Sequence, residues 1–333
     1  MIKRIVKRAV FVVLAALAST AAMAQTATVK TETVRIQKYP GVVSLLAVVA
    51  AEKGYCSKHG LDCVLVTNSS SVVGLQALLS GGLDVATPAV ATALQLAAKG
   101  TPVRFIGNAW QKNPYEFAVD AQAAMPKDLS AMMRTLKGKR IGVTTRGSGP
   151  EYALRSFLQE AGMKEGDVTV VAVGAPDLAY AALVNKQIDA AISYPPMGAL
   201  CEVMKTCNIY AMLSKGEWPK ELDMLDGAQI PLVVRAELAE KKPHVVKALR
   251  SAFKEAEAFI QADGNLDALI AMVNKHNKFD NPKAAELTKV LVRNAIPAFF
   301  FDLDPKALQA ASDYMLRTDQ LDKPYDTSGL SVL

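Results

Sequence analysis

A ten-residue segment occurs twice in the chain, 105 positions apart, and it constrains the fold more than any other feature. Residues 77–86 read ALLSGGLDVA and residues 182–191 read ALVNKQIDAA. In each copy an apolar helix end is followed by a polar turn, an apolar residue, an aspartate (Asp84 or Asp189) and a short apolar strand. One supersecondary unit used twice predicts two similar α/β lobes. The cleft between two facing lobes is a common place for a small molecule to bind.

The first 24 residues have the pattern of a secretory signal peptide. Residues 3–8 form a basic start, residues 9–18 an apolar run, and residues 22–24 a small-x-small cleavage site. The apolar run is too short to span a bilayer, although a membrane anchor is the alternative interpretation. No cysteine follows the cleavage site, which argues against a lipid anchor. We expect residues 1–24 to be removed and the remaining chain to be a soluble, exported protein.

The net charge gives no indication of a nucleic-acid partner. The formal charge is +6, and the signal segment contains four basic and no acidic residues, so 6 less 4 leaves +2 for the mature chain. We find no long basic stretch interleaved with aromatic residues, which a nucleic-acid-binding surface requires. Roughly 309 residues remain after the signal, enough for one large or two medium domains with buried cores.

Four cysteines form two close pairs, Cys56 with Cys63 and Cys201 with Cys207. In an exported protein, an even number of cysteines at short spacings favours disulfides. The alternative is a metal site with four thiolates. That site requires the two pairs to meet, and neither pair has the CxxC spacing that is common in such sites. We therefore predict two disulfides that fasten surface turns, and no metal site.

Predicted strands alternate with predicted helices through most of the chain, which indicates βαβ units and mostly parallel sheets flanked by helices. The alternation restarts near residue 137, and after residue 234 the chain becomes helical. This helical tail has no sheet of its own, so we expect it to pack on the first lobe. Two crossings near residues 116–120 and 229–234 would join the lobes and permit closure around a ligand. The predicted domains are residues 1–24 (signal peptide), 28–116 plus 230–333 (lobe 1) and 117–229 (lobe 2).

Ligands of open parallel α/β sheets bind beyond the carboxyl ends of the strands, where helix N-termini point N–H groups outward. This rule selects two serine-containing loops, residues 68–71 and 147–149, as sites for an anionic group such as sulfonate, nitrate or carboxylate. Aromatic residues on neighbouring loops could form an apolar wall, and an arginine could neutralise the anion. The alternatives are helix capping, loop packing and a solvated arginine. The predicted ligand-binding residues are Tyr39, Ser69, Ser70, Ser71, Thr87, Trp110, Arg146, Ser148, Gly149 and Tyr194.

Signals of enzymatic chemistry are weak. The chain has no GxSxG or GxGxxG motif, and its three histidines lack metal-binding spacing and lie outside the predicted cleft loops. Asp84 and Asp189 lie at the wrong ends of their strands for the cleft, and we interpret them as turn and cap residues. Lys38 is the one lysine that could reach the cleft, but no general base is identifiable near it. We predict a protein that is not an enzyme, with no catalytic residues, no metal and no cofactor.

Several segments, weak when taken singly, form a specific pattern in their order and spacing. They are residues 51–55 (AEKGY) with 60–62 (GLD), 83–86 (LDVA), 136–143 (LKGKRIGV), 147–149 (GSG), 187–191 (QIDAA) and the helix 243–262. Together they resemble the periplasmic substrate-binding proteins of ABC importers, of the sulfonate, nitrate and taurine type. That group also includes relatives of pyrimidine-precursor proteins of the thiamine pathway. The resemblance implies a type II periplasmic binding protein fold, with two α/β lobes joined by two hinge crossings.

The resemblance also implies a function and partners. A monomer in the periplasm would capture a small anionic or polar organic solute, of the sulfonate, nitrate or carboxylate class, and deliver it to an ABC importer permease. The alternative is a pyrimidine-precursor binding protein or a related enzyme of thiamine metabolism. Cys56 stands where the resemblance leads us to expect an aromatic residue, which fits a local disulfide variant. The cysteine-rich motif of the pyrimidine-synthase relatives is not found here, which argues against the enzyme.

Overall fold

The computed structural model describes residues 31–217, 222, 225–279 and 282–332. The predicted signal peptide, residues 1–24, lies outside the described residues. Thr31 and the residues after it belong to one structural unit, so the predicted limits of two separate lobes, 28–116 plus 230–333 and 117–229, stay a prediction. Among the helices of the described residues, none has the length and apolar character needed to cross a membrane.

The first half, by which we mean residues 31–110 and 230–332, contains a mixed sheet. β1 (Glu32–Lys38) lies parallel to β2 (Leu61–Thr67), and β3 (Val103–Trp110) lies antiparallel to β9 (Ile230–Arg235). Val85 bridges to β1 in parallel, and Ala86 bridges to β9 in antiparallel orientation. These bridges join the two strand pairs in the order β2, β1, residues 85–86, β9, β3.

The second half, residues 116–212, repeats this arrangement. β5 (Arg140–Val143) lies parallel to both β6 (Thr169–Ala172) and β7 (Ala190–Ser193). β4 (Glu116–Asp120) lies antiparallel to β7 and to β8 (Cys207–Met212), which gives the order β6, β5, β7, β4, β8. The register is repeated as well, because Glu32 pairs with Leu61 and Arg140 with Thr169, in both cases 29 positions apart. The predicted α/β class with parallel-rich sheets is confirmed.

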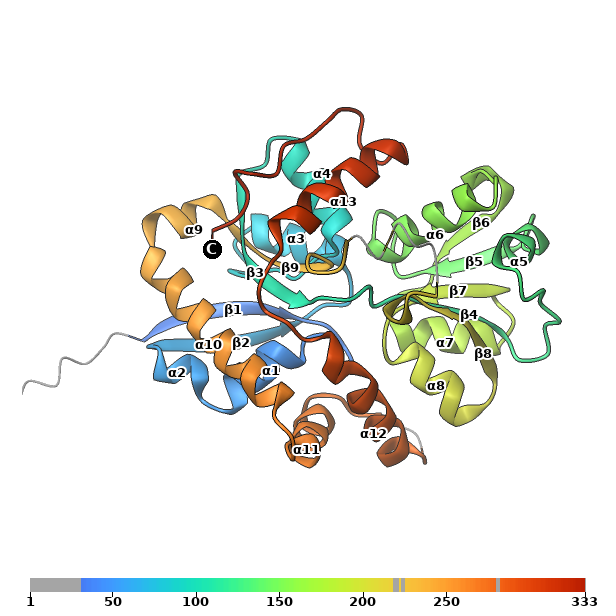
Figure 1. The fold of residues 1–333 in the computed structure, drawn as a ribbon. Coiled ribbons are helices and arrows are strands. Elements are labelled where there is room, and N and C mark those ends of the chain that lie inside the picture. Colours follow the sequence, from blue (N-terminus) through green and yellow to red (C-terminus); the bar gives the residue numbers. More distant parts are fainter. Residues whose placement is uncertain (1–30, 218–221, 223–224, 280–281, 333) are drawn as a thin grey trace, which may run out of the picture. The chain divides into compact units, whose positions relative to one another are not determined.

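The two predicted crossings are strands that pair inside the sheets. β4 follows β3 along the chain but pairs in the second sheet, and β9 follows β8 but pairs in the first (Figure 1). Their central residues, Phe117 to Val119 and Leu232 to Val234, are almost completely buried. Because each of these strands directly follows a strand of the other sheet along the chain, we call β4 and β9 the exchanged strands. Their apolar sequences fill the sheets on both faces.

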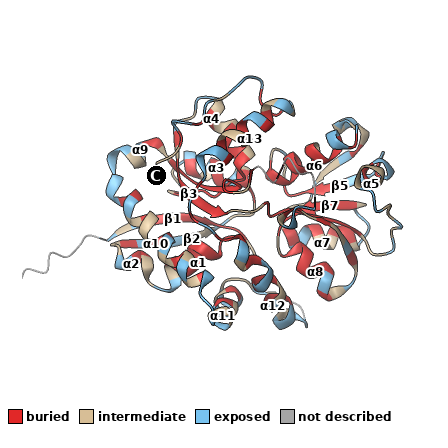
Figure 2. Cartoon of the chain, in the orientation of Figure 1, coloured by how far each residue is buried: buried red, intermediate tan, exposed pale blue. Residues whose placement is uncertain are grey.

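Helices cover the faces of both sheets, and their apolar sides are turned inward (Figure 2). In the first half they are α1 (Leu45–Glu52), α2 (Tyr55–Lys58), α3 (Ser71–Leu79) and α4 (Val90–Ala98). In the second half they are α5 (Leu129–Thr135), α6 (Gly149–Glu160), α7 (Pro176–Val184) and α8 (Met197–Met204). The tail contains α9 (Ala236–Lys241), α10 (Pro243–Gln261), α11 (Leu266–His276), α12 (Ala284–Ala295) and α13 (Pro305–Arg317).

The tail packs mainly on the first half. α10 buries an amphipathic face, which includes Leu249, Phe253 and Ile260, against α1 and α2, and α13 contacts α4. α12 is the exception, because it also contacts α8 of the second half. The tail therefore adds a contact between the halves beside the crossing strands.

Both predicted disulfides are present. Cys56 is bonded to Cys63, which ties α2 to β2, and Cys201 is bonded to Cys207, which ties α8 to β8. The prediction is confirmed, and the alternative of four free thiolates at a metal site is excluded. Among the described residues there is no cluster of three or more potential metal ligands.

Candidate functional site

A small cavity lies where the strand ends of the two halves meet, and we call it the tyrosine cavity. Its volume is about 20 Å³, which is room for roughly one water molecule. It is lined by Tyr39, Val43, Ser69, Ser70, Ser71, Pro114, Tyr115, Thr144, Ser148, Pro150, Tyr194 and Ile230. Tyr39, Thr144 and Tyr194 directly follow β1, β5 and β7, so the cavity lies at the carboxyl ends of parallel strands. This is the place at which open α/β sheets bind ligands.

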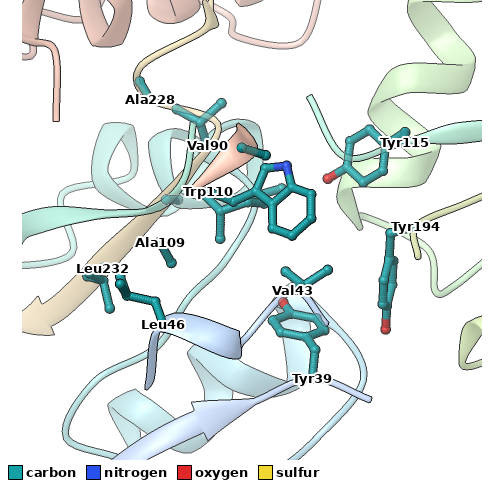
Figure 3. Packing of buried hydrophobic residues seen from close by; sticks show 14 of the residues in the cluster. Tyr39, Val43, Leu46, Val90, Ala109, Trp110, Tyr115, Tyr194, Ala228 and Leu232 are labelled. Atoms are coloured by element: carbon teal, nitrogen blue, oxygen red, sulfur yellow. The ribbon is translucent and has the colours of Figure 1, made fainter. Parts of the chain in front are cut away.

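Three buried tyrosines, Tyr39, Tyr115 and Tyr194, line the cavity, and Figure 3 shows their rings. The ring of Tyr194 meets that of Tyr39 edge-on, with 5.5 Å between the ring centroids. The Tyr194 hydroxyl donates to the Ser69 carbonyl at 2.8 Å, which is a direct hydrogen bond between the halves. Tyr115 lies against Gly149, where an added Cβ would come within 1.6 Å of the tyrosine oxygen. The close approach of the Tyr115 ring therefore requires a glycine at position 149, whether or not this residue contacts a ligand.

The tyrosines remain neutral at physiological pH. Burial raises the pKa of Tyr39 to about 12, against a smaller opposite effect of its hydrogen bonds. Burial also raises the pKa of Tyr115 and of Tyr194 well above the usual value. Each ring therefore offers an apolar face and a phenol group that can both donate and accept a hydrogen bond.

Two helices begin at the cavity, one from each half. Ser70 is the N-cap of α3, and its hydroxyl accepts a hydrogen bond from the Val73 N–H at 3.2 Å. Ser148 precedes α6, and its hydroxyl donates to the Thr145 carbonyl at 2.6 Å. Both serines line the same cavity. The capping alternative thus holds for Ser70, while the positive ends of two helix dipoles still converge on the space between the halves.

The sequence interpretation did not identify Gln37, which organises the loops of the first half. Its buried side chain donates to the Asn68 side chain (2.6 Å) and to the Ser70 carbonyl (3.1 Å), and accepts from the Thr87 N–H (2.9 Å). One amide within β1 therefore links this strand to the segments that follow β2 and residues 85–86. A glutamine inside the apolar strand sequence VRIQK was the available signal. Gly74 leaves room for it, since a Cβ there would lie 2.1 Å from the Gln37 oxygen.

Two unpaired hydroxyls of the second half were not among the predicted ligand residues. Thr144 follows β5 and Ser193 ends β7, and the side-chain oxygen of each is buried without a hydrogen-bond partner among the described residues. Thr144 lines the tyrosine cavity. Buried hydroxyl groups normally have a partner, so these two are available to a ligand or to a water molecule.

The structure brings six of the ten predicted ligand residues to the tyrosine cavity, namely Tyr39, Ser69, Ser70, Ser71, Ser148 and Tyr194. Thr87 gives its N–H to Gln37, and Gly149 packs on Tyr115. Trp110 is buried edge-on against Phe299 and lines a different pocket, and its indole nitrogen has no partner within the described residues. The ligand role of all ten residues stays a prediction.

Arg146 points away from this cavity. Its guanidinium forms ion pairs with Glu151 (2.9 Å) and Glu165 (2.5 Å), and about half of its side chain (54%) is exposed. Among the described residues that line the tyrosine cavity there is no lysine or arginine. Neutralisation of an anion in this cavity would therefore come from N–H groups and hydroxyls.

Sequence comparisons match this chain to one protein family and to proteins that are named as binding proteins. Residues 43–265 match the family described as NMT1/THI5 like. A protein of Brucella abortus (strain 2308) that is named as a binding protein is 31% identical over 224 residues, 66% of this chain and 63% of that protein. The riboflavin-binding protein RibY of Chloroflexus aurantiacus is 30% identical over 183 residues, 54% of this chain and 50% of RibY. The matches thus span less than two thirds of each relative's length.

Solved structures share the fold at low sequence identity. The alkanesulfonate-binding protein SsuA of Xanthomonas axonopodis pv. citri, bound to MOPS, has a TM-score of 0.69 and 18% identity, and the match covers 90% of this chain and 98% of SsuA. The periplasmic nitrate-binding protein NrtA of Synechocystis PCC 6803 has a TM-score of 0.71 and 17% identity, covering 90% and 84%. The chain therefore has the periplasmic binding protein fold.

Proposed function

Because this chain belongs to the NMT1/THI5-like family, we propose that it binds a small solute between its two halves and delivers it to the permease of an ABC importer. The proposal includes export directed by residues 1–24, a periplasmic location, a monomeric state and no catalytic activity. Support comes from the signal pattern of the sequence and from structural neighbours whose names describe periplasmic binding proteins.

One observation carries the proposal: the tyrosine cavity is built from strand-end residues of both halves. A solute held there would contact Ser70 and Tyr39 of one half and Ser148 and Tyr194 of the other. Such a ligand stabilises the closed arrangement, because only closure brings both sets of contacts to it. The cavity is too small for most solutes as it stands, so the halves must separate for entry and close less tightly around the ligand.

The solute class that we favour carries an anionic or strongly polar oxygen group on a small organic body. The two helix starts supply N–H groups and positive dipole ends for the oxygens. The unpaired Thr144 hydroxyl adds a donor, and the tyrosine faces accept the apolar part of the molecule. Sulfonates, nitrate and carboxylates fit this description.

A planar heteroaromatic solute, such as a pyrimidine precursor, is the second candidate. It is favoured by the three neutral tyrosines and by the lack of a cationic side chain among the lining residues. An enzyme of that class would need a nucleophile with a general base beside it. Lys38 is not among the residues that line the tyrosine cavity, and no histidine is either.

A thermal-shift screen followed by calorimetry on the mature protein tests the proposal. The panel contains alkanesulfonates, nitrate, aromatic carboxylates, aminopyrimidines and riboflavin. A solute present at a hundred times its dissociation constant should add about 2.7 kcal/mol to the free energy of unfolding. Tyr194→Phe, which removes the hydroxyl that bridges the halves, should weaken binding several-fold, whereas Tyr325→Phe, outside the cavity, should not. A folded protein that binds no member of the panel contradicts the proposal.

A further inference from the structure

A second and larger pocket lies between the halves, and we call it the lysine pocket. Its volume is about 510 Å³, within the range that small-molecule sites occupy. Lys38, His276 and Phe279 line it from the first half, and Asp177, Tyr180 and Leu200 line it from the second. As far as the described residues go, it shares no lining residue with the tyrosine cavity.

The two spaces are separated by the chain itself. Lys38 is the last residue of β1 and Tyr39 follows it, and consecutive side chains of an extended segment point in opposite directions. Tyr39 accordingly lines the tyrosine cavity, and Lys38 lines the lysine pocket. The lysine pocket is thus a distinct space, and it does not depend on what the tyrosine cavity binds.

Lys38 is unusual among the lysines of the described chain. It is only 7% exposed, and within the described part of the chain its ammonium group has a single hydrogen bond, to the His276 carbonyl at 3.2 Å. None of the ion pairs of the described residues includes Lys38. By contrast, the neighbouring Lys275 is exposed and pairs with Glu52 at 2.6 Å. A buried charge without a counter-charge is costly, so a chain that keeps one in a pocket offers a binding site for the opposite charge.

The other residues that line the pocket indicate which groups a ligand would carry beside its anionic group. Phe279 and Leu200 provide apolar surface from the two halves. The His276 imidazole lies 2.8 Å from the Glu52 carboxylate, and the His276 backbone carbonyl accepts the hydrogen bond from Lys38. Asp177 lines the side that belongs to the second half and forms no ion pair with Lys38, while the lysines of the lining, Lys38 and Lys278, belong to the first half.

We propose that the lysine pocket is an anion-binding site that takes a small organic carboxylate, sulfonate or phosphate ester. The anionic oxygens accept hydrogen bonds from the Lys38 ammonium, and the apolar part lies between Phe279 and Leu200. Because both halves line the pocket, an occupied pocket favours the closed arrangement.

Calorimetry with benzoate, benzenesulfonate and phenyl phosphate tests the site, with benzamide as the uncharged analogue. The mature protein should bind at least one of the three anions in preference to benzamide. Lys38→Met should reduce that affinity about tenfold or more, and Lys38→Arg should largely retain it. Lys247→Met, which removes the same charge from the exposed surface of α10, should leave it unchanged.

The melting temperature without ligand separates a binding role from a structural one. Lys38→Met should melt at the same or a higher temperature, since it removes a buried charge that has no counter-charge. A lower melting temperature together with unchanged anion affinity would show that Lys38 serves the fold, and would overturn the proposal. Failure of all three anions to bind the unsubstituted protein would overturn it equally.

Discussion

The two halves contain the same arginine–aspartate pair in different surroundings. Arg35 Nε lies 3.0 Å from Asp84 Oδ2, and Arg140 Nε lies 3.1 Å from Asp189 Oδ2. Each aspartate also accepts the backbone N–H of its arginine, at 2.9 Å and 2.8 Å, and gives its own N–H to the arginine carbonyl. Both residues of the second pair lie 105 positions after those of the first. The pair therefore joins β1 to the segment at residues 84–86 in the first half, and β5 to the start of β7 in the second.

The two pairs differ because the strand beside each aspartate carries a different residue, and these strands are β9 in the first half and β4 in the second. In the first half, Arg235 at the end of β9 adds a second guanidinium to Asp84, at 3.4 Å. The register places Asp120 of β4 at the corresponding position of the second half, where it cannot pair with another aspartate. The Asp84 side chain is 14% exposed and the Asp189 side chain 31%. The repeated unit determines which arginine and aspartate pair. The exchanged strand beside them determines how deeply the aspartate is buried and how far its charge is neutralised.

Removing the charge of each aspartate in turn should give the largest difference in stability between the two halves. Asp84→Asn should lower the free energy of unfolding by about 3 kcal/mol, because two arginines lose a partly buried counter-charge. Asp189→Asn should lower it by less than about 1 kcal/mol, because that pair is more exposed and has one arginine. Urea unfolding at pH 7 measures both. Equal losses would mean that Arg235 and the lower exposure contribute nothing.

The acid dependence of stability offers a check on the same pair. Burial acts against ionisation of Asp84, but the hydrogen bonds and charge of Arg35 prevail and hold its pKa below the usual value. Stability from this carboxylate is present above the unfolded-state pKa and is lost as the pH falls. The Asp84→Asn protein should therefore lose less stability below about pH 4 than the unsubstituted protein does.

The disulfides test whether the halves unfold together. Each half has one, although the repeat places no cysteine at the corresponding positions of the other half. Replacing either pair, Cys56 and Cys63 or Cys201 and Cys207, by serines should cost about 2–3 kcal/mol by loop-closure entropy. Because strands are exchanged, we expect one unfolding transition in both variants, with unchanged ligand preference. Two transitions in calorimetry would show that the halves unfold separately.

The sequence was sufficient for the repeat, the α/β class and the disulfides, because these depend on local periodicity and spacing. Strand exchange was not predictable, since pairing of β4 with β7 and of β9 with residue 86 depends on partners far along the chain. The same limit applies to Asp84 and Asp189. Their turn position was evident from the sequence, but their arginine partners lie 49 positions away.

The site was predictable at the level of loops and less so at the level of side chains. The strand-end rule located the serine loops. It also placed Arg146 in the cleft, whereas that side chain turns outward and pairs with Glu165. Tyr115 was missed because it lies in the connection between β3 and the exchanged strand β4. Lys38 was noticed as a lysine near the cleft, but only the fold shows which pocket it enters.

The exchanged strands also differ in one buried charge. β4 begins with Glu116, whose pKa is raised to about 7 by burial, against the opposing effects of the Gly198 N–H and Lys215. β9 begins with Ile230 at the corresponding end. A folded-state pKa above the unfolded value of 4.5 means that stability falls as the pH rises from about 4.5 to about 7.

Glu116→Gln should remove this dependence. The unsubstituted protein should lose about 2 kcal/mol between pH 5 and pH 7.5 from this group, and the variant should not. Urea unfolding at the two pH values, with Glu237→Gln on the exposed surface as the control, measures the effect. If the two proteins have the same pH profile over this range, Glu116 is ionised in the folded state like an ordinary glutamate.

The smallest expected effect concerns the helices that follow the second strand in each half. Ser70 caps α3 through its side chain, whereas Ala175, 105 positions later, stands at the N-cap of α7 and has no side-chain acceptor. The backbone of both residues is extended, so a serine can cap at either position. Ser70→Ala should cost about 1 kcal/mol, and Ala175→Ser should add about 0.5–1 kcal/mol by accepting the Leu178 N–H. Thermal unfolding of the two single variants and the double variant measures both terms, which should be additive because the helices belong to different halves. If Ala175→Ser leaves the stability unchanged, the start of α7 is already satisfied by another partner, and the repeat does not extend to the capping of its helices.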